Sequence, residues 1–293
     1  MNSPKILVSG LLLNCLFAGV SYAGTTSGEK VATTLNQRYE KVVSDCDGDP
    51  AYYCSGVIVR SNEDIAHATW QPYLRADEHF LQFSFLRKDM GFFEGAIWSF
   101  NDIGFGIVLE NGKADGFKSR CIFPENAFSV IRKTNGCGDF KSKNKLRDED
   151  EDNSTCESKG VLTSGDWIKK YGIGDGDYCS FSTHNAKYFN EAIKTSVQLV
   201  SDKRLLQNNE LIINTSPSFW DVKDPSKDHI QALWYNPKTI ESSSIHGLAG
   251  AQSEQKLYYQ LTKKWIPILS INMSSEPAIF SYSESDQIIS PQT

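Results

Sequence analysis

Three polar residues stand beside apolar, strand-like segments, where their chemistry needs an explanation. Arg60 ends the apolar run 54–60, and Ser84 lies between two phenylalanines. Glu210 directly precedes the apolar run 211–213. A guanidinium among apolar neighbours needs an anion, either a protein carboxylate or a ligand phosphate. A serine hydroxyl can hydrogen-bond a carboxylate, and a carboxylate at the mouth of a strand can face a cleft. Taken singly, each residue also fits an ordinary role: a salt bridge, a strand hydroxyl and a solvated strand end.

Other catalytic and binding motifs are missing or incomplete in the sequence. The five histidines include no pair at the i, i+4 spacing of a helical zinc site. The acidic turn 45–49 lacks the glutamate that completes an EF-hand calcium loop. The glycines at 172, 174 and 176 do not follow a strand and open a helix, so no dinucleotide fingerprint is indicated. No Gly-x-Ser-x-Gly elbow occurs, although a serine triad of other geometry stays open. No metal site is expected.

The first 23 residues have the features of a secretory signal peptide. Lys5 precedes the apolar run 6–20, and the small residues Ser21 and Ala23 predict cleavage before Gly24. The run is shorter than the roughly 20 residues of a bilayer-spanning helix, so we expect no membrane anchor in the mature form. A lipoprotein processed at Cys15 is the alternative. Residues 24–293 are therefore expected to be a single secreted domain, with extracellular release and periplasmic retention both open.

Export makes disulfides the expected state of the cysteines. Removal of Cys15 leaves six, an even number that leaves none for catalysis. Six cysteines allow about 15 pairings, among which a sequence does not choose. We expect sequential pairing because each pair then brackets a turn-rich segment. The expected bonds are Cys46–Cys54, Cys121–Cys137 and Cys156–Cys179.

Hydrophobic periodicity predicts an α+β fold of short strands mixed irregularly with helices. The expected helices cover residues 29–44, 164–171 (after a Thr163–Asp166 capping box), 185–200 and 248–261. The expected strands cover residues 52–60, 79–86, 105–110, 127–133, 210–213, 230–235, 265–273 and 278–282. Residues 141–152, a basic run followed by acidic residues, are expected to form a solvated loop. The net charge of −6, which becomes −7 without Lys5, does not suggest a nucleic-acid partner. The oligomeric state is left open.

In this order, Arg60, Ser84 and Glu210 resemble the three-part signature of cholera-toxin-type ADP-ribosyltransferases. The matching segments are Val59-Arg60-Ser61, Phe83-Ser84-Phe85 and Asn208-Asn209-Glu210. The chain more specifically resembles the halovibrin-like family of secreted bacterial NAD-glycohydrolases. That resemblance runs through residues 46–60, 83–89, 135–138, 209–211 and 247–252, and so covers nearly all of the mature chain. It implies a split, mixed β-sheet core with flanking helices.

The resemblance also implies roles for the three residues, with NAD as substrate and no cofactor. Arg60 would hold a phosphate of NAD, which suits its permanent planar charge. Ser84 would orient Glu210. Glu210 would hydrogen-bond the nicotinamide ribose and stabilise an oxocarbenium-like transition state as nicotinamide leaves. Water would then capture the ribosyl centre.

Two departures from the family pattern favour hydrolysis of NAD over transfer to a protein. Phe85 follows Ser84 where the family often has a second hydroxyl residue, and Asn208 stands where arginine-specific transferases have glutamate. Glu254, in the sequence Gln252-Ser253-Glu254, is the second-ranked catalytic candidate because it lies in a predicted helix. The alternatives to a hydrolase are an ADP-ribosyltransferase toxin and a non-catalytic, disulfide-stapled binding module. In that module the contact residues would be Trp70, Trp98 and Trp220.

Overall fold

The computed structural model describes residues 27–62, 80–91, 94–97, 99–110, 118–126, 155–172, 178–202, 208–214, 229–239, 246–273 and 279–290. The predicted leader 1–23, strand 127–133 and loop 141–152 lie outside these ranges. The described part has mixed α/β structure. Its α-helices are α1 (Ser27–Glu40), α2 (Ser164–Tyr171), α3 (Ala186–Ser201) and α4 (Gly247–Thr262). Its strands are β1 (Asp45–Cys46), β2 (Asp49–Pro50), β3 (Val57–Ser61), β4 (Phe80–Leu86), β5 (Phe105–Leu109), β6 (Lys118–Phe123), β7 (Phe181–Ser182), β8 (Glu210–Asn214), β9 (Ile230–Tyr235), β10 (Ile268–Ile271) and β11 (Phe280–Tyr282).

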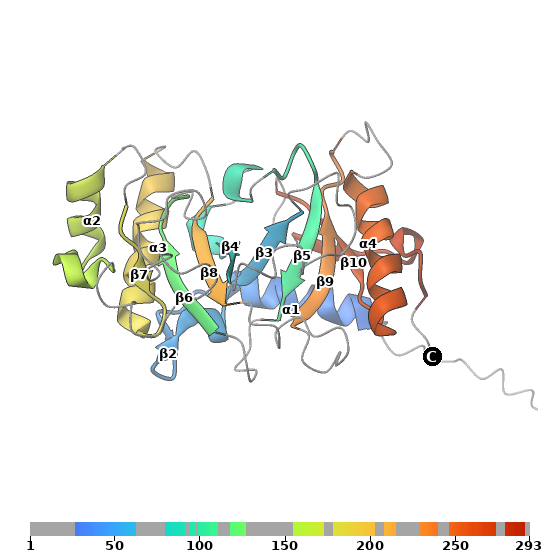
Figure 1. Cartoon of the computed structure of the whole chain (residues 1–293), viewed down its shortest axis with the longest axis horizontal. Helices are drawn as coiled ribbons and strands as arrows, with labels where there is room; N and C mark the ends of the chain where they lie inside the picture. Colours follow the sequence, from blue (N-terminus) through green and yellow to red (C-terminus); the bar gives the residue numbers. More distant parts are fainter. Residues whose placement is uncertain are drawn as a thin grey trace, which may run out of the picture.

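Nine of these strands form one large mixed sheet. Its strand order is β11-β10-β9-β5-β3-β4-β8-β6-β7, and β1 pairs with β2 in a separate small hairpin. Strands β9 and β10 are parallel, whereas β3, β4, β5, β6 and β8 pair antiparallel with their neighbours. Strands β3 and β5 lie in the middle of the molecule, with α2 and α3 at one end and α4 at the other (Figure 1). Residues far apart in the chain therefore meet at the centre of the sheet.

The two faces of the central strands pack into two different hydrophobic clusters. Ile58 of β3 and Ile107 of β5 belong to a cluster that includes buried residues of α3 and α4. Their neighbours along the same strands, Val59 and Val108, belong to a cluster with α1. This division follows from the alternation of side chains along a strand. The sheet is thus covered by α1 on one face and by α3 and α4 on the other.

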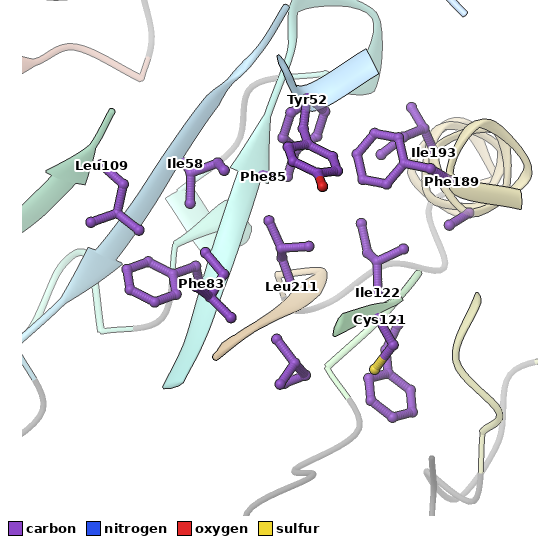
Figure 2. Packing of buried hydrophobic residues seen from close by; sticks show 14 of the residues in the cluster. Tyr52, Ile58, Phe83, Phe85, Leu109, Cys121, Ile122, Phe189, Ile193 and Leu211 are labelled. Atoms are coloured by element: carbon purple, nitrogen blue, oxygen red, sulfur yellow. The ribbon is translucent and has the colours of Figure 1, made fainter. Parts of the chain in front are cut away.

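Aromatic contacts fix α3 over β4. The ring of Phe189 on α3 meets Phe85 of β4 edge-to-face, with ring centroids 5.3 Å apart. The Phe189 ring also meets Tyr52 edge-to-face, with ring centroids 5.1 Å apart (Figure 2). Such pairs contribute roughly 0.5–1.5 kcal/mol beyond the burial of their area. They hold the helix against the strand that carries Ser84.

Most of the predicted elements that fall in the described residues are confirmed. Strand β9 has the predicted bounds, β4, β5 and β8 differ from prediction by one residue at one end, and α3 and α4 differ by one residue at each end. The capping box of α2 is present, since the Asp166 amide donates to Thr163 Oγ1 at 3.2 Å and the Thr163 amide donates to Asp166 Oδ2 at 3.1 Å. Local signals such as this capping box predict the bounds of a helix or strand correctly when the apolar pattern of that element agrees with its packing.

Other sequence-based expectations are wrong, including the predicted strand 265–273, which is confined to β10 (Ile268–Ile271). The first helix ends at Glu40 rather than residue 44, because the chain turns so that Arg87 Nη1 donates to Val43 O at 2.7 Å. The strand predicted from Tyr52 begins only at Val57, after a 3-10 turn at Ala51–Tyr53. Strand β6 was not predicted, because its first half, Lys-Ser-Arg, is polar.

Two of the three predicted disulfides are confirmed. Cys46 is bonded to Cys54, and Cys156 is bonded to Cys179. Cys121 is also disulfide-bonded, and its predicted partner Cys137 lies outside the described residues. The Cys46–Cys54 bond closes the hairpin immediately before β3, and so limits the freedom of the strand that carries Arg60.

Candidate functional site

The central feature of the sheet is that β4 changes its partner at Ser84. Its residues 84–86 pair with β3, where Val59 lies opposite Ser84. Its residues 80–83 instead pair with β8, ending with Phe83 opposite Leu211. Beyond Val59, β3 pairs only with β5 in this part of the sheet. The sheet therefore splits at Ser84, and we call this place the strand junction.

Arg60 lies at the opening of the strand junction. It follows Val59, so alternation directs its side chain to the face of Ile58 rather than to the face that Val59 shares with Ser84. Its guanidinium nevertheless reaches β4, where Nη1 donates to Gln82 O at 2.7 Å. The guanidinium thus bonds a carbonyl of β4 beyond the last residue pair of the β3–β4 ladder. Arg60 is partly exposed.

The backbone of Arg60 is held from the far side of β5. Trp234 of β9 lies opposite Gly106 of β5, which in turn lies opposite Ser61. The Trp234 indole Nε1 donates to Arg60 O at 3.1 Å. A Cβ atom on Gly106 would collide with Arg60 O and with Ser61 Cα. The missing side chain at position 106 therefore allows the close approach that fixes Arg60.

Replacing Gly106 with Ala is expected to destabilise the fold. The added methyl group meets backbone atoms that cannot rotate away, and overpacking of this kind typically costs about 1–3 kcal/mol. For a chain of this size, in which each kcal/mol shifts Tm by about 2–4 °C, that corresponds to a fall in Tm of roughly 2–12 °C in a thermal melt. Gly165→Ala is the matched control, since a Cβ there meets nothing closer than Thr163 Oγ1 at 3.8 Å. Equal melting of Gly106→Ala and wild type would contradict this account.

The segment before β3 is anchored to α1 by one arginine. Arg38 donates to the carbonyls of Tyr52, Tyr53 and Gly56, at 2.9, 3.3 and 3.2 Å. Burial lowers the pKa of Arg38 to about 10, although the charge of Glu110 opposes this shift. The group stays protonated at neutral pH. These bonds explain why residues 52–56 turn instead of continuing β3.

Glu210 begins β8 and lies on the same row as Ser84. The β4–β8 register pairs Phe83 with Leu211, so its next step places Ser84 opposite Glu210. Residues directly opposite in an antiparallel pair have their side chains on the same face and close together. Both residues are buried, with 3% of Ser84 and 1% of Glu210 exposed. The register therefore places Ser84 and Glu210 on one row and one face of the sheet, whereas the side chain of Arg60 starts from the opposite face.

Glu254, the second-ranked candidate, lies away from these three strands, on α4. Its side chain is 1% exposed, and both carboxyl oxygens are buried without a hydrogen-bond partner. Burial raises the pKa of Glu254 to about 8, so the group is neutral at pH 7. A neutral carboxyl group cannot stabilise developing positive charge as a carboxylate does. Nearby Gln252 donates to Asp286 O at 3.0 Å.

Other kinds of site find little support in the part of the chain that is described. Within it, no group of three or more His, Cys, Asp and Glu residues is placed to hold a metal ion. No helix among those residues has the length and apolarity to cross a membrane. A groove of about 490 Å³ runs between α3 and residues 42–44, and its lining includes Val43, Ile193 and Val197 but none of the three candidates. Trp70, Trp98 and Trp220 lie outside the described residues.

The sequence matches no protein-family model and no curated protein. A fold does not by itself define a function, so a functional argument for this large mixed sheet with α-helices on both faces has to come from the site.

Two residues of the site were missed by the sequence reasoning. Trp234 bonds Arg60 from 174 positions away, and Asn209 bonds the backbone of Phe85 from 124 positions away. The only local signal was the pair Asn208-Asn209 ahead of an apolar run. Asparagine is disfavoured in strands because its side chain competes for backbone hydrogen bonds. Two asparagines beside a strand therefore indicate that their side chains bond backbone groups.

Proposed function

We propose that the protein is a secreted NAD glycohydrolase that cleaves NAD to nicotinamide and ADP-ribose. The observation that carries the proposal is the change of partner of β4 at Ser84. It supports an ADP-ribosyltransferase-like split sheet, because Arg60, Ser84 and Glu210 lie on the three consecutive strands β3, β4 and β8 around the split. Ser84 and Glu210 share one face at the strand junction, and the Arg60 guanidinium reaches β4 there from the other face, where it bonds Gln82 O.

In this proposal the three side chains have different tasks. Arg60 binds a phosphate of NAD with its permanently charged guanidinium. Ser84 orients the carboxylate of Glu210. Glu210 stabilises the positive charge that develops on the ribose as the bond between C1′ and the nicotinamide nitrogen breaks. Water then adds to C1′ and releases a proton, which gives ADP-ribose.

The burial of Ser84 and Glu210 favours such chemistry and sets a condition on it. A carboxylate shielded from water interacts more strongly with a nearby positive charge than an exposed one. With only 1% of Glu210 exposed, however, the strand junction has to open before a dinucleotide reaches it. Motions of this kind commonly accompany substrate entry into enclosed sites.

Export is part of the same proposal. The two confirmed disulfides and the bonded Cys121 support folding in an oxidising compartment, where such bonds persist. The leader 1–23 supplies the route.

The direct test incubates the purified mature protein with NAD labelled in its adenylate part. We expect the label to appear as free ADP-ribose, because Asn208 replaces the acidic residue of arginine-specific transferases. Free nicotinamide, measured by chromatography, should rise in equal amount. Label bound to protein would instead support a transferase. Intact NAD after long incubation would overturn the enzymatic proposal and favour the binding module.

A further inference from the structure

Asn209 takes the place of a backbone group in the β4–β8 ladder. The Phe85 amide donates to Asn209 Oδ1 at 2.8 Å, and Asn209 Nδ2 donates to Phe85 O at 2.7 Å. A carboxamide offers one acceptor and one donor side by side, as a peptide group does. The β4–β8 register, continued past Phe83 and Leu211, would pair Phe85 with residue 209. Strand β8 begins at Glu210, one residue after Asn209. The Asn209 side chain therefore makes the two hydrogen bonds to Phe85 that a backbone pair would otherwise make.

The bonds of Asn209 are buried and fixed at both ends. Asn209 is 4% exposed, and its own carbonyl accepts a hydrogen bond from Asn208 Nδ2 at 2.8 Å. Phe85 is fully buried and paired with Ile58 of β3 on its other side. Buried hydrogen bonds of this kind are costly to leave unmade, so they restrict the position of the residue that makes them.

We propose that Asn209 is a positioning residue for Glu210. Glu210 is the first residue of β8, where Phe123 of β6 pairs with it on one side, and a strand end is held more firmly when both of its sides are tied down. The Asn209–Phe85 bonds tie this end to β4 one residue before Glu210, and so hold Glu210 on the row of Ser84. Asn209 itself acts only through Glu210. The expected effect of Asn209 on kcat rests on the proposed function, whereas its effect on the position of Glu210 does not.

The chain contains a matched control for Asn209. Asn36 of α1 also binds the backbone of a phenylalanine through both ends of its carboxamide, and its Oδ1 accepts in addition from the Ile279 amide at 3.2 Å. Its Nδ2 donates to Phe280 O at 2.8 Å, and its Oδ1 accepts from the Phe280 amide at 3.0 Å. Phe280 belongs to β11, the outer strand at the far end of the nine-stranded order. Loss of this bond pair should cost stability without reaching the strand junction.

The test compares Asn209→Ala with Asn36→Ala in steady-state NAD cleavage and in thermal melts. We expect both variants to melt lower by a few degrees, since each loses the backbone hydrogen bonds of one carboxamide, which are buried at Asn209 and partly buried at Asn36. Only Asn209→Ala should lower kcat, by about 10²-fold, because small misplacements of a catalytic group have effects of this size. KM should change little. In a Glu210→Gln background, Asn209→Ala should lower the residual rate no further.

A second measurement does not need activity. The carboxyl carbon of Glu210 is titrated by NMR in wild type, Asn209→Ala and Asn36→Ala, and a changed titration midpoint is expected in Asn209→Ala alone. If the wild type leaves NAD intact, the proposed function fails and this titration decides the positioning role. An unchanged Glu210 midpoint in Asn209→Ala would overturn that role. So would equal kcat values for the two variants of an active enzyme.

Discussion

Glu210→Gln is expected to lower kcat for NAD cleavage by about 10³-fold while leaving KM nearly unchanged. Glutamine keeps the size of the side chain and its hydrogen bonding to a ribose hydroxyl, but it removes the negative charge. That charge matters only as the ribose becomes positive, so its loss acts on the transition state and not on substrate binding. A 10³-fold loss corresponds to about 4 kcal/mol of transition-state stabilisation. Initial rates over a range of NAD concentrations separate kcat from KM.

The matched control for Glu210→Gln is Glu254→Gln, which removes the other buried carboxyl group. Both residues are 1% exposed, so the two variants alter equally buried positions. We expect Glu254→Gln to keep wild-type kcat, since its carboxyl group is neutral at pH 7 and lies on α4. Thermal melts show whether either variant is misfolded. Loss of activity in Glu254→Gln with retention in Glu210→Gln would move the catalytic role to Glu254.

The elements that the sequence predicted well are those whose apolar pattern agrees with their final packing. The run Leu211-Ile212-Ile213 is fully buried in β8, and the stripe of α3 faces the sheet as expected. Strand β6 was missed because Lys118, Ser119 and Arg120 do not resemble a buried strand, yet β8 and β7 pair on either side of it. Tertiary pairing outweighed local preference there.

The candidate site could be predicted only as a set of residue types. Nothing in the spacing of Arg60, Ser84 and Glu210 shows that β4 changes partner at Ser84, because this is a property of registers between distant strands. The supporting contacts are equally non-local. The Trp234 indole reaches Arg60 O only because position 106 lacks a side chain, and Asn209 reaches Phe85 only in the β4–β8 register. Such contacts depend on the registers of distant strands, which local sequence patterns do not determine.

Glu254→Gln is also expected to stabilise the fold at neutral pH, and this effect should depend on pH. Burial raises the pKa of Glu254 from 4.5 to about 8. The unfolded chain loses this proton near pH 4.5, whereas the folded protein keeps it until about pH 8. The unfolded state therefore binds fewer protons between these values, and the stability of wild type falls as the pH rises through this window. Glutamine does not ionise, so the variant lacks this part of the fall in the free energy of unfolding with rising pH.

At pH 7 the expected gain is about 3 kcal/mol in the free energy of unfolding, since each pKa unit corresponds to about 1.4 kcal/mol. Urea unfolding at intervals between pH 4 and 8 measures it, and the two proteins should converge near pH 4. Glu191→Gln on α3 is the opposite control. Although burial alone would raise it, hydrogen bonds from Lys194 and Ser164 lower the pKa of Glu191, so its stabilisation is present above pH 4.5 and is lost as the pH falls. Removing Glu191 should therefore destabilise the fold at pH 7. If the stability of Glu254→Gln and of wild type shows the same pH dependence, Glu254 has a partner that keeps it ionised. The argument that Glu254 is neutral, and therefore not the catalytic carboxylate, would then be wrong.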